Sequence, residues 1–557
     1  MDLVQRFRGG LSPANLVALR GLNLVRALAA GVAFLAVFGI TAIWQHAPYD
    51  IQAGPVARVV AGVEPILMAS VAAAAILRPW PGYVAVLFLT PVFDVPQVSW
   101  TVGPVQVISQ TIFAVVLLVA VALEWVARVG GFRRAVASLA PASWPRPWLR
   151  LHRSPDHMAA VSFVALMAVA GLSTLFSPDR GTSATILLHG ILEPAAMALI
   201  LLSLRPTRRQ LTIVLIAVSI SVAVGGFLNM AQTIPAMRSL SVIQTNRLLF
   251  SRITYFNVGL FGEMLAMAMP LLIVALLARR RLGLGRLAVA LVVAAILVCL
   301  VSLFLTFSKS AYLATFGACL VLILLVVQTW RRRAAIVLAT CLASTVVIPW
   351  PALILQVSPP LEQAYRSAMV TLMGESRYDS WNPSTLAGQG SLLERWYATR
   401  AGIEMAIDHP LLGIGLDQFR GLYLGHYRTP QDQNAPDWAH SMYPEAAAEL
   451  GIPALVLELI LYLAAFWAMW RVYRAPPDGL ARLLAAGLLA AMVSWQVVGL
   501  AFAGDMYRPW RNMASDYVMM MVLVAASFAL YRMTRRGDTS GAPGDASRAA
   551  PTDASVA

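Results

Sequence analysis

The chain has 557 residues, of which 59% are hydrophobic and only 12% charged, with a formal net charge of +15. Soluble domains have about 45–50% apolar and about 25% charged residues, so this composition excludes an ordinary soluble protein. It predicts an all-α, polytopic membrane protein, because a helix satisfies its own backbone hydrogen bonds inside a bilayer. The positive charge does not require nucleic acid as a partner, because the basic residues cluster between apolar runs, as the positive-inside rule describes.

Apolar runs of about the length needed to cross a bilayer recur along the chain and predict about 14 transmembrane helices. They lie at 27–45, 57–77, 82–95, 103–126, 158–176, 184–203, 211–229, 258–278, 287–306, 310–329, 334–355, 446–470, 482–503 and 515–532. The third run is short and bounded by prolines, so a re-entrant segment is an alternative for it. The first run follows basic residues, as a signal peptide would, but further spans follow it, and we expect it to be retained.

Arginine clusters lie in alternate connections and therefore predict one orientation, with both termini cytoplasmic. The clusters are Arg128, Arg133 and Arg134; Arg205, Arg208 and Arg209; Arg279 to Arg281; Arg331 to Arg333; Arg471 and Arg474; and Arg532, Arg535 and Arg536. We expect four parts: helices 1 to 11 at 1–355, a large external loop at 356–443, helices 12 to 14 at 444–536, and a disordered cytoplasmic tail at 537–557.

Basic residues on the external side depart from this charge bias. The predicted loop 230–256 carries Arg238, Arg247 and Arg252 and no acid. Lys309, the only lysine of the chain, lies at the external end of a tight helical hairpin. The external loop 356–443 contains nine acids and six arginines. An anion site there must therefore depend on individually placed arginines.

A helix is predicted over 391–408, because apolar residues recur at steps of three or four. Its apolar stripe consists of Leu392, Trp396, Thr399, Ile403, Ala406 and Ile407. We expect this stripe to lie on the membrane-embedded body, with Arg395 and Arg400 on opposite edges of it. These arginines are candidates for contacts with lipid phosphates, and ordinary salt bridges within the loop are the alternative.

The residues that follow bring glycines and a histidine to the membrane surface. Gly413 and Gly415 allow a tight turn or a close backbone approach, which is weak evidence for a phosphate loop. His440 precedes a helix expected to begin at Pro444, and a neutral imidazole there can act as a general base near physiological pH. A structural or merely exposed histidine is the alternative, and His409 and His426 compete for the same role.

The predicted spans also contain ionisable residues, namely Glu64, Glu193, Glu263, Glu458 and His189. Such groups are costly in a bilayer and often functional, so a proton relay is one interpretation. Hydrogen bonding between helices is the interpretation we favour. His189 and Glu193 lack a third ligand and do not predict a metal site. The three cysteines lie in apolar runs and predict neither a disulfide nor a metal site.

Two segments resemble the signature region of the O-antigen ligase and O-antigen polymerase superfamily. They are RWYATRAGIEMAIDHPLLGIGLDQF and AHSMYPEAAAELGIPAL. LTFSKSAYLA and RITYFNVGLFGEMLAMAMPL resemble two other parts of the family pattern. Ser441 stands where the family usually has asparagine, and Lys309 where it usually has arginine.

The resemblance implies a GT-C-like glycosyltransferase without a metal or another cofactor. It would transfer a glycan from an undecaprenyl-diphosphate donor to an acceptor hydroxyl at the periplasmic face of the bacterial inner membrane. By the same resemblance, His440 would be the base and Arg395 would bind the diphosphate with Arg247 or Arg252. Arg400 and Lys309 are further candidates for diphosphate binding.

The sequence leaves alternatives open for the acceptor and for the class of protein. We expect an O-antigen ligase whose acceptor is lipid A–core, with an O-antigen or exopolysaccharide polymerase, or a pilin O-oligosaccharyltransferase, as alternatives. A polysaccharide flippase is the candidate from another class, and a structural assembly factor is a third. The large external loop and the absence of an internal repeat favour the transferase over a transporter.

Overall fold

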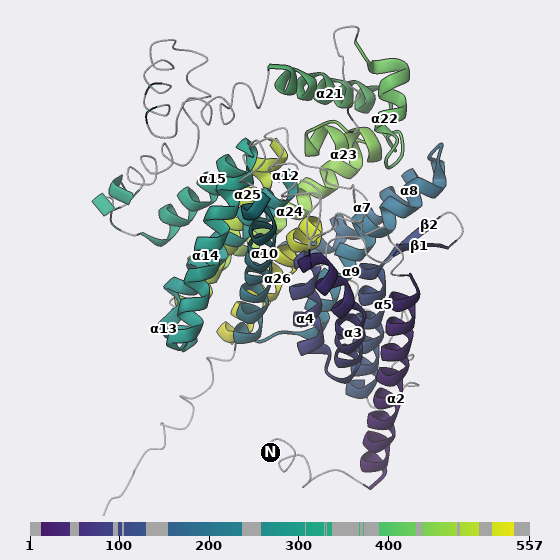
Figure 1. The fold of residues 1–557 in the computed structure, drawn as a ribbon, viewed down its shortest axis with the longest axis vertical. Helices are drawn as coiled ribbons and strands as arrows, with labels where there is room; N and C mark the ends of the chain where they lie inside the picture. The colour runs from purple at the N-terminus through teal and green to yellow at the C-terminus, as the bar shows by residue number, and fades with distance from the viewer. Residues whose placement is uncertain are drawn as a thin grey trace, which may run out of the picture.

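A computed structural model describes most of the chain. The described residues are 13–44, 55–92, 99–102, 105–129, 154–236, 258–306, 308–327, 389–429, 438–475, 479–500 and 515–539, with a few isolated positions between them. Long helices run side by side as a bundle, and a separate layer of helices covers one of its ends (Figure 1).

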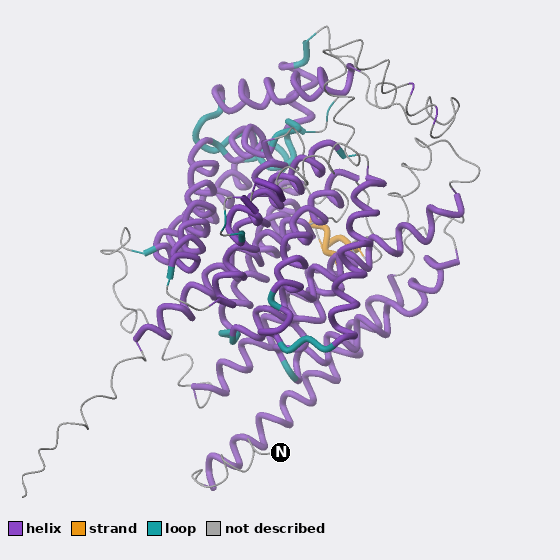
Figure 2. Tube along the Cα trace, turned by 90° about the vertical axis from the view of Figure 1, so that its left-hand side faces the viewer, coloured by secondary structure: helices purple, strands orange, loops and turns teal. Residues whose placement is uncertain are grey.

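Helices make up nearly all of the described part of the chain. They are α2 (Pro13–Trp44), α3 (Pro55–Leu77), α4 (Pro79–Val92), α5 (Ser109–Val129), α7 (Pro155–Phe176), α8 (Arg180–Ile186), η3 (Leu187–Leu192), α9 (Glu193–Leu204), α10 (Arg208–Ala236), α12 (Val258–Leu277), α13 (Arg279–Leu282), α14 (Arg286–Thr306), α15 (Lys309–Val326), α21 (Gln389–Asp408), α22 (Phe419–Leu422), η4 (Tyr423–Tyr427), α23 (Met442–Leu450), α24 (Ile452–Arg474), α25 (Gly479–Leu500) and α26 (Ser515–Thr539). The two strands, β1 (Ser99–Val102) and β2 (Val105–Ile108), pair in one antiparallel hairpin, which Figure 2 places among the helices.

Seven of the described helical segments are long and apolar enough to cross a membrane. They are Pro155–Phe176, Arg180–Leu204, Arg208–Ala231, Arg286–Leu303, Ile452–Arg474, Gly479–Leu500 and Tyr517–Arg535, and five shorter apolar helices accompany them. The helical architecture is therefore confirmed, while the count of 14 spans remains a prediction. The run at 334–355 lies almost entirely outside the described residues.

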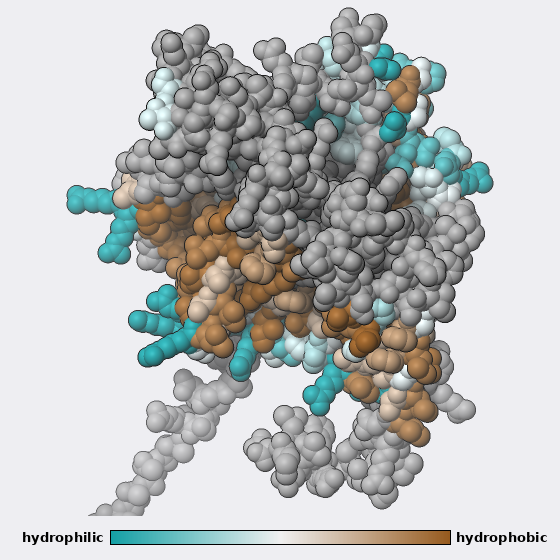
Figure 3. Space-filling model, viewed as in Figure 1, coloured by the Kyte–Doolittle hydropathy of each residue, from teal (hydrophilic) through white to brown (hydrophobic). Residues whose placement is uncertain are grey.

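The outer helices expose apolar side chains. Leu287 of α14 is 75% exposed, and Leu291 and Leu297 of the same helix are also exposed. A hydrophobic band crosses the molecule, with hydrophilic side chains at its lower edge (Figure 3). An exposed apolar band of this kind is what the hydrocarbon core of a bilayer covers.

The inner helices α12, α25 and α26 pack closely through small residues. Ala485, Ala486 and Gly487 of α25 are buried, and a Cβ built on Gly487 would lie 2.9 Å from Val274 of α12. Small residues at such contacts let helix backbones approach one another inside a membrane.

Two predicted spans differ from the observed elements. The predicted span 103–126 includes strand β2, and helix α5 starts only at Ser109. The span 446–470 is divided at Gly451, whose φ of 90° interrupts the helix between α23 and α24. A residue with this positive φ cannot continue an α-helix, so Met442–Leu450 forms a separate short helix before the span.

The layer formed by α21, α22 and α23 defines one end of the bundle, which we call the cap end. The Ser173 hydroxyl near the end of α7 donates to the carbonyl oxygen of Glu449 in α23 at 2.9 Å. The Ser441 hydroxyl donates to the carbonyl oxygen of Gly499 near the end of α25 at 3.2 Å. Helix α7 therefore begins at the opposite end, which we call the far end.

Candidate active site

Helix α21 packs on the start of α23 through a hydrogen bond and a close glycine contact. The Thr399 hydroxyl donates to the carbonyl oxygen of Ala439 at 2.8 Å. A Cβ built on Gly402 would lie 2.9 Å from the Cβ of Ala439 and 3.3 Å from that of Pro444. A side chain at position 402 would therefore force the two helices apart.

Arg395 lies on the face of α21 that contacts this segment. It is half-buried and precedes Thr399 by about one helical turn and Gly402 by about two, so all three lie on one side of the helix. Thr399 is bonded to Ala439, the residue before His440. Arg395 is about one helical turn from Thr399, so the backbones at Arg395 and His440 lie near each other. Two residues of the predicted site are thus brought to one interface.

Arg400 lies on the opposite side of α21. Its Nε donates to Oε1 of Glu404 at 2.7 Å, and both side chains are largely exposed. This is the ordinary i,i+4 salt bridge that the sequence left as its alternative interpretation. The pair turns Arg400 away from the interface with α23.

His440 is half-buried at the residue before Ser441, the N-cap position of α23. Its φ of 54° lies in the left-handed region, which non-glycine residues adopt at a cost of about 1–3 kcal/mol. The imidazole ring lies against Trp438, with ring centroids 5.1 Å apart. Strained backbone conformations of this kind cluster at active sites and ligand-binding sites.

The residues after His440 join it to α25. The Ser441 hydroxyl bonds to Gly499 and makes no side-chain hydrogen bond to the start of α23. The Tyr443 hydroxyl bonds to Oε1 of Gln496. Burial and the nearby Glu458 carboxylate raise the pKa of Tyr443 to about 12, so its hydroxyl stays protonated and donates this bond. Helix α25 therefore holds the start of α23, and with it His440, in place.

The glycine-rich turn after α21 binds the end of α23. The backbone amide of Ile414 donates to the carbonyl oxygen of Ala448 at 2.8 Å, and that of Gly415 to the carbonyl oxygen of Glu449 at 3.1 Å. These are carbonyls of the last helical turn, which have no partner within their own helix. A Cβ on Gly413 would lie 2.4 Å from the Glu449 backbone. The close backbone approach expected of these glycines is confirmed, and it serves packing against α23.

A second set of contacts fastens the same turn to the bundle. The amide of Ile452 donates to the carbonyl oxygen of Pro410 at 2.9 Å. The Ser183 hydroxyl of α8 donates to the carbonyl oxygen of Leu416 at 2.7 Å. A Cβ on Gly415 would lie 2.5 Å from the Ser177 hydroxyl oxygen. The turn 409–418 therefore connects the cap layer to α7 and α8.

The apolar stripe predicted for α21 was wrong in part: Thr399 and Ala406 are buried, but the large apolar residues whose side chains the structure describes are not. Trp396, Ile403 and Ile407 are exposed, at 55%, 49% and 67%. The buried residues are Ala398, Thr399, Ala401, Gly402, Met405 and Ala406. Small residues occupy the contact because the backbone of α23 comes so close. Their spacing of three and four was the sequence signal for this face, and the larger apolar residues concealed it.

The competing histidines lie elsewhere. His409 and His426 are both exposed, one after the end of α21 and the other in η4. The η4 segment is fixed by a bond of 2.6 Å from the Tyr427 hydroxyl to Oδ2 of Asp408. Burial and the Asp408 carboxylate raise the pKa of Tyr427 to about 12. Of the three histidines of this region, His440 has the most enclosed position.

The other predicted anion-binding residues can be placed only in part. Lys309 begins α15, whose N-cap is Ser308, and Ala314 of α15 packs with Val498 of α25. The start of α15 therefore lies at the cap end. Arg247 and Arg252 lie outside the described residues, and so does Arg238.

Several acids are buried in the described bundle. His189 Nδ1 lies 2.9 Å from Oε1 of Glu193, which also accepts from Thr111. The Tyr462 hydroxyl donates to Oε1 of Glu458 at 2.7 Å. The bond from Thr111 of α5 to Glu193 joins two helices, as the interpretation that we favoured expects, whereas the other two bonds lie within one helical segment. Among the described residues, no group of three histidine, cysteine, aspartate or glutamate side chains could hold a metal ion.

Sequence reasoning missed some residues that shape the site. Gly402 sets the distance between α21 and the His440 segment, and Trp438 packs on the imidazole. Glu445 and Glu449 of α23, the helix that follows His440, are completely buried.

One comparison with known proteins identifies part of the chain. Residues 294–459 match a family model described as O-antigen ligase. The matched range includes Lys309, Arg395 and His440, and it confirms the resemblance to the O-antigen ligase and polymerase superfamily. No curated protein matches the chain. Together with the seven apolar helices, the match indicates a membrane protein.

Proposed function

Because residues 294–459 match a family model described as O-antigen ligase, we propose that this protein transfers a glycan from an undecaprenyl-diphosphate donor to an acceptor hydroxyl. The reaction takes place at the periplasmic face of the bacterial inner membrane. The observation that carries the proposal is the bond from Thr399 to Ala439. It joins the helix that bears Arg395 to the residue before His440.

The chemistry follows from the two side chains. A neutral imidazole of His440 accepts the proton of the acceptor hydroxyl as its oxygen attacks the anomeric carbon of the glycan. The bond from that carbon to the phosphate oxygen breaks, and the lipid diphosphate leaves with the electron pair. Negative charge grows on the leaving phosphate in the transition state. A guanidinium group can bind two of its oxygens and stabilise that charge.

Arg395 is the arginine of α21 that we assign to the diphosphate. It shares the contact face with Thr399, whereas Arg400 is paired with Glu404 on the other side. Arg247 or Arg252 is its proposed partner, with Lys309 as a further cation at the cap end. Arginines of this kind can neutralise a diphosphate, so transfer without a metal or cofactor is part of the proposal.

The acceptor that we propose is lipid A–core, which makes the protein an O-antigen ligase. An O-antigen or exopolysaccharide polymerase and a pilin O-oligosaccharyltransferase use the same chemistry on other acceptors. Deletion of the gene separates them on a polysaccharide gel. A ligase predicts that long chains disappear from lipid A–core while polymer stays on its lipid carrier. Single repeats on lipid A–core would instead indicate a polymerase, and unmodified pilin an O-oligosaccharyltransferase.

A flippase would move the lipid-linked glycan across the membrane instead of transferring the glycan at the cap end. Purified protein in detergent, with lipid-linked donor and acceptor but no membrane gradient, distinguishes the two classes. The transferase predicts that glycan moves to the acceptor and that free undecaprenyl diphosphate is released. No product under these conditions, together with transport in sealed vesicles, would contradict the proposed function.

A further inference from the structure

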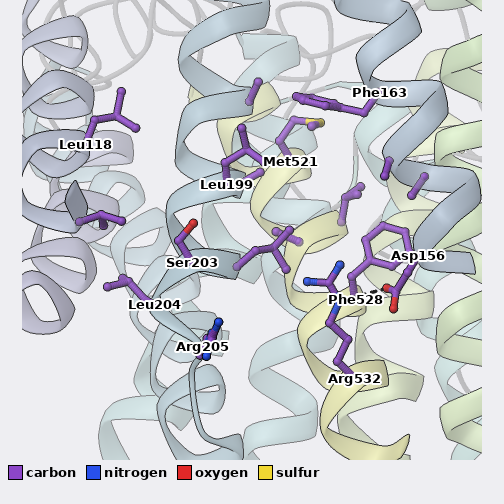
Figure 4. Close-up of a pocket in the computed structure, with 18 of the residues that line it drawn as sticks. Leu118, Asp156, Phe163, Leu199, Ser203, Leu204, Arg205, Met521, Phe528 and Arg532 are labelled. Carbon is purple, nitrogen blue, oxygen red and sulfur yellow. Dashed lines mark ion pairs between the residues drawn. The ribbon is translucent and has the colours of Figure 1, made fainter. Parts of the chain in front are cut away.

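A cavity of about 1030 Å³ lies between α5, α7, α9, α24 and α26. Its walls are mostly apolar and include Leu118, Phe163, Leu199, Met521 and Phe528. Figure 4 shows these side chains around the space, with Asp156, Arg205 and Arg532 toward its lower end. The volume is at the upper end of the range for ligand sites, which is roughly 300–1,000 Å³.

Three arginines and two carboxylates form the charged end of the cavity. Arg128 pairs with Glu124 at 3.3 Å, and Arg532 pairs with Asp156 at 3.3 Å. Arg205 is the third arginine of the lining. It follows α9 with a φ of 49° and ends that helix. The end of the cavity therefore carries one more positive than negative charge.

This cavity is separate from the candidate active site. Asp156 lies in the first turn of α7, whereas Ser173 of the same helix bonds to α23 at the cap end. The 17 residues between them correspond to about 26 Å of helix. The arginines of the cavity thus lie at the far end, across the bundle from His440.

We propose that this cavity binds an anionic glycerophospholipid. The apolar walls between membrane helices suit its acyl chains, and the arginines at the helix ends suit its phosphate. Arg532 uses its Nε for Asp156, and the planar guanidinium fork can contact a phosphate at the same time. The excess of positive charge favours an anionic headgroup over a zwitterionic one.

The test uses the full-length protein purified in detergent and exposed to equal amounts of dioleoyl phosphatidylglycerol and dioleoyl phosphatidylcholine. Native mass spectrometry then measures which lipid is retained. These two lipids have identical acyl chains and differ in headgroup charge. We expect phosphatidylglycerol to be retained preferentially, by about fivefold for each arginine that contributes about 1 kcal/mol. Equal retention of the two lipids would overturn the proposal.

Matched variants locate the bound lipid. Arg128→Gln with Arg205→Gln removes two charges from the cavity, and Arg279→Gln with Arg280→Gln removes two exposed charges of α13 at the same end. The first pair should abolish the preference for phosphatidylglycerol, and the second should keep it. The same result for both pairs would contradict the cavity as the site.

A third variant tests the site even if the Arg128→Gln, Arg205→Gln double variant fails to fold. Ser203→Leu narrows the cavity near Arg205 and keeps every arginine. We expect it to lose retained phosphatidylglycerol while its thermal unfolding stays close to that of the unaltered protein. Undiminished retention by this variant would overturn the proposal. Because no glycan donor is present, failure here is distinct from failure of the proposed transfer reaction.

Discussion

The hydroxyl of Thr399 donates a hydrogen bond of 2.8 Å to the carbonyl oxygen of Ala439, 40 residues further along the chain. This bond joins two segments that the proposed reaction needs together. Arg395 lies one turn before Thr399, and His440 directly follows Ala439. The geometry of the site therefore depends on contacts made by neighbouring residues that take no part in the chemistry.

Thr399→Val should lower the rate of transfer with little effect on membrane insertion. The substitution keeps the shape of the side chain but leaves the buried carbonyl of Ala439 without its donor, at a cost of about 1–3 kcal/mol. Thr399→Ser keeps the hydroxyl and should retain most of the activity. Rates of transfer by purified protein at saturating donor compare the two. Equal rates in the valine and serine variants would contradict a positioning role.

Gly402→Leu should separate α21 from the His440 segment. Even a Cβ at this position would lie 2.9 Å from Ala439, and overpacking of this kind costs about 1–3 kcal/mol. Gly421 of α22 has nothing within 4 Å of a built Cβ, so Gly421→Leu is the matched control. We expect loss of transfer only for Gly402→Leu. The measurement is transfer activity per amount of folded protein, from size-exclusion chromatography.

Gly413→Ala should destabilise the cap layer. The residue has a φ of 67°, and a Cβ would lie 2.4 Å from the backbone of Glu449. Strain and overlap together should cost about 1–3 kcal/mol. Gly425→Ala is the control, because a Cβ there meets nothing within 4 Å. Thermal unfolding in detergent should show a lower midpoint for Gly413→Ala alone, and a lowered midpoint in both would contradict the packing role of this turn.

Asp179→Asn should change how the stability of the folded protein depends on pH. Asp179 caps α8 by accepting from the side chain and backbone of Thr182, and these bonds lower the pKa of its carboxyl. The lowered pKa means that this stabilisation is present above about pH 4 and is lost as the pH falls through the folded value. Asparagine also caps helices but does not titrate.

Thermal unfolding of both proteins between pH 3 and pH 7 measures this effect. The gap between their midpoints should narrow or reverse in favour of Asp179→Asn below about pH 4. Midpoints that fall in parallel over the whole range would show that this carboxylate does not contribute. Asp179→Ala, which has no cap at any pH, should lie below both near neutral pH.

The positions of the helices followed from the sequence because apolar runs of bilayer length leave few alternatives. Helices α7, α12 and α14 begin and end within a few residues of the predicted spans, and α10 extends further than its predicted span. The hairpin at Ser99–Ile108 was missed, because its apolar residues continue into the run that forms α5. A short apolar stretch fits strand and helix equally well when only its composition is considered.

The site was harder to predict because its contacts join distant segments. The sequence placed His440 before a helix, and α23 begins two residues later. It did not reveal that Gly402 and Ala439 touch, since no local pattern encodes a contact between two helices. The prediction of the buried face of α21 was partly wrong for the same reason. Small residues pack against α23 there, while Trp396 and Ile403 remain exposed.

The central claim is tested most directly by four variants in one transfer assay with purified protein, lipid-linked donor and acceptor. His440→Ala and Arg395→Ala remove the proposed base and the proposed diphosphate ligand. His426→Ala and Arg400→Ala remove the same residue types from exposed positions of the same region. We predict that the first two lose transfer by about 100-fold or more, as general-base and charge-stabilising groups do, while the controls stay within about threefold. Full activity in His440→Ala or Arg395→Ala would contradict the account.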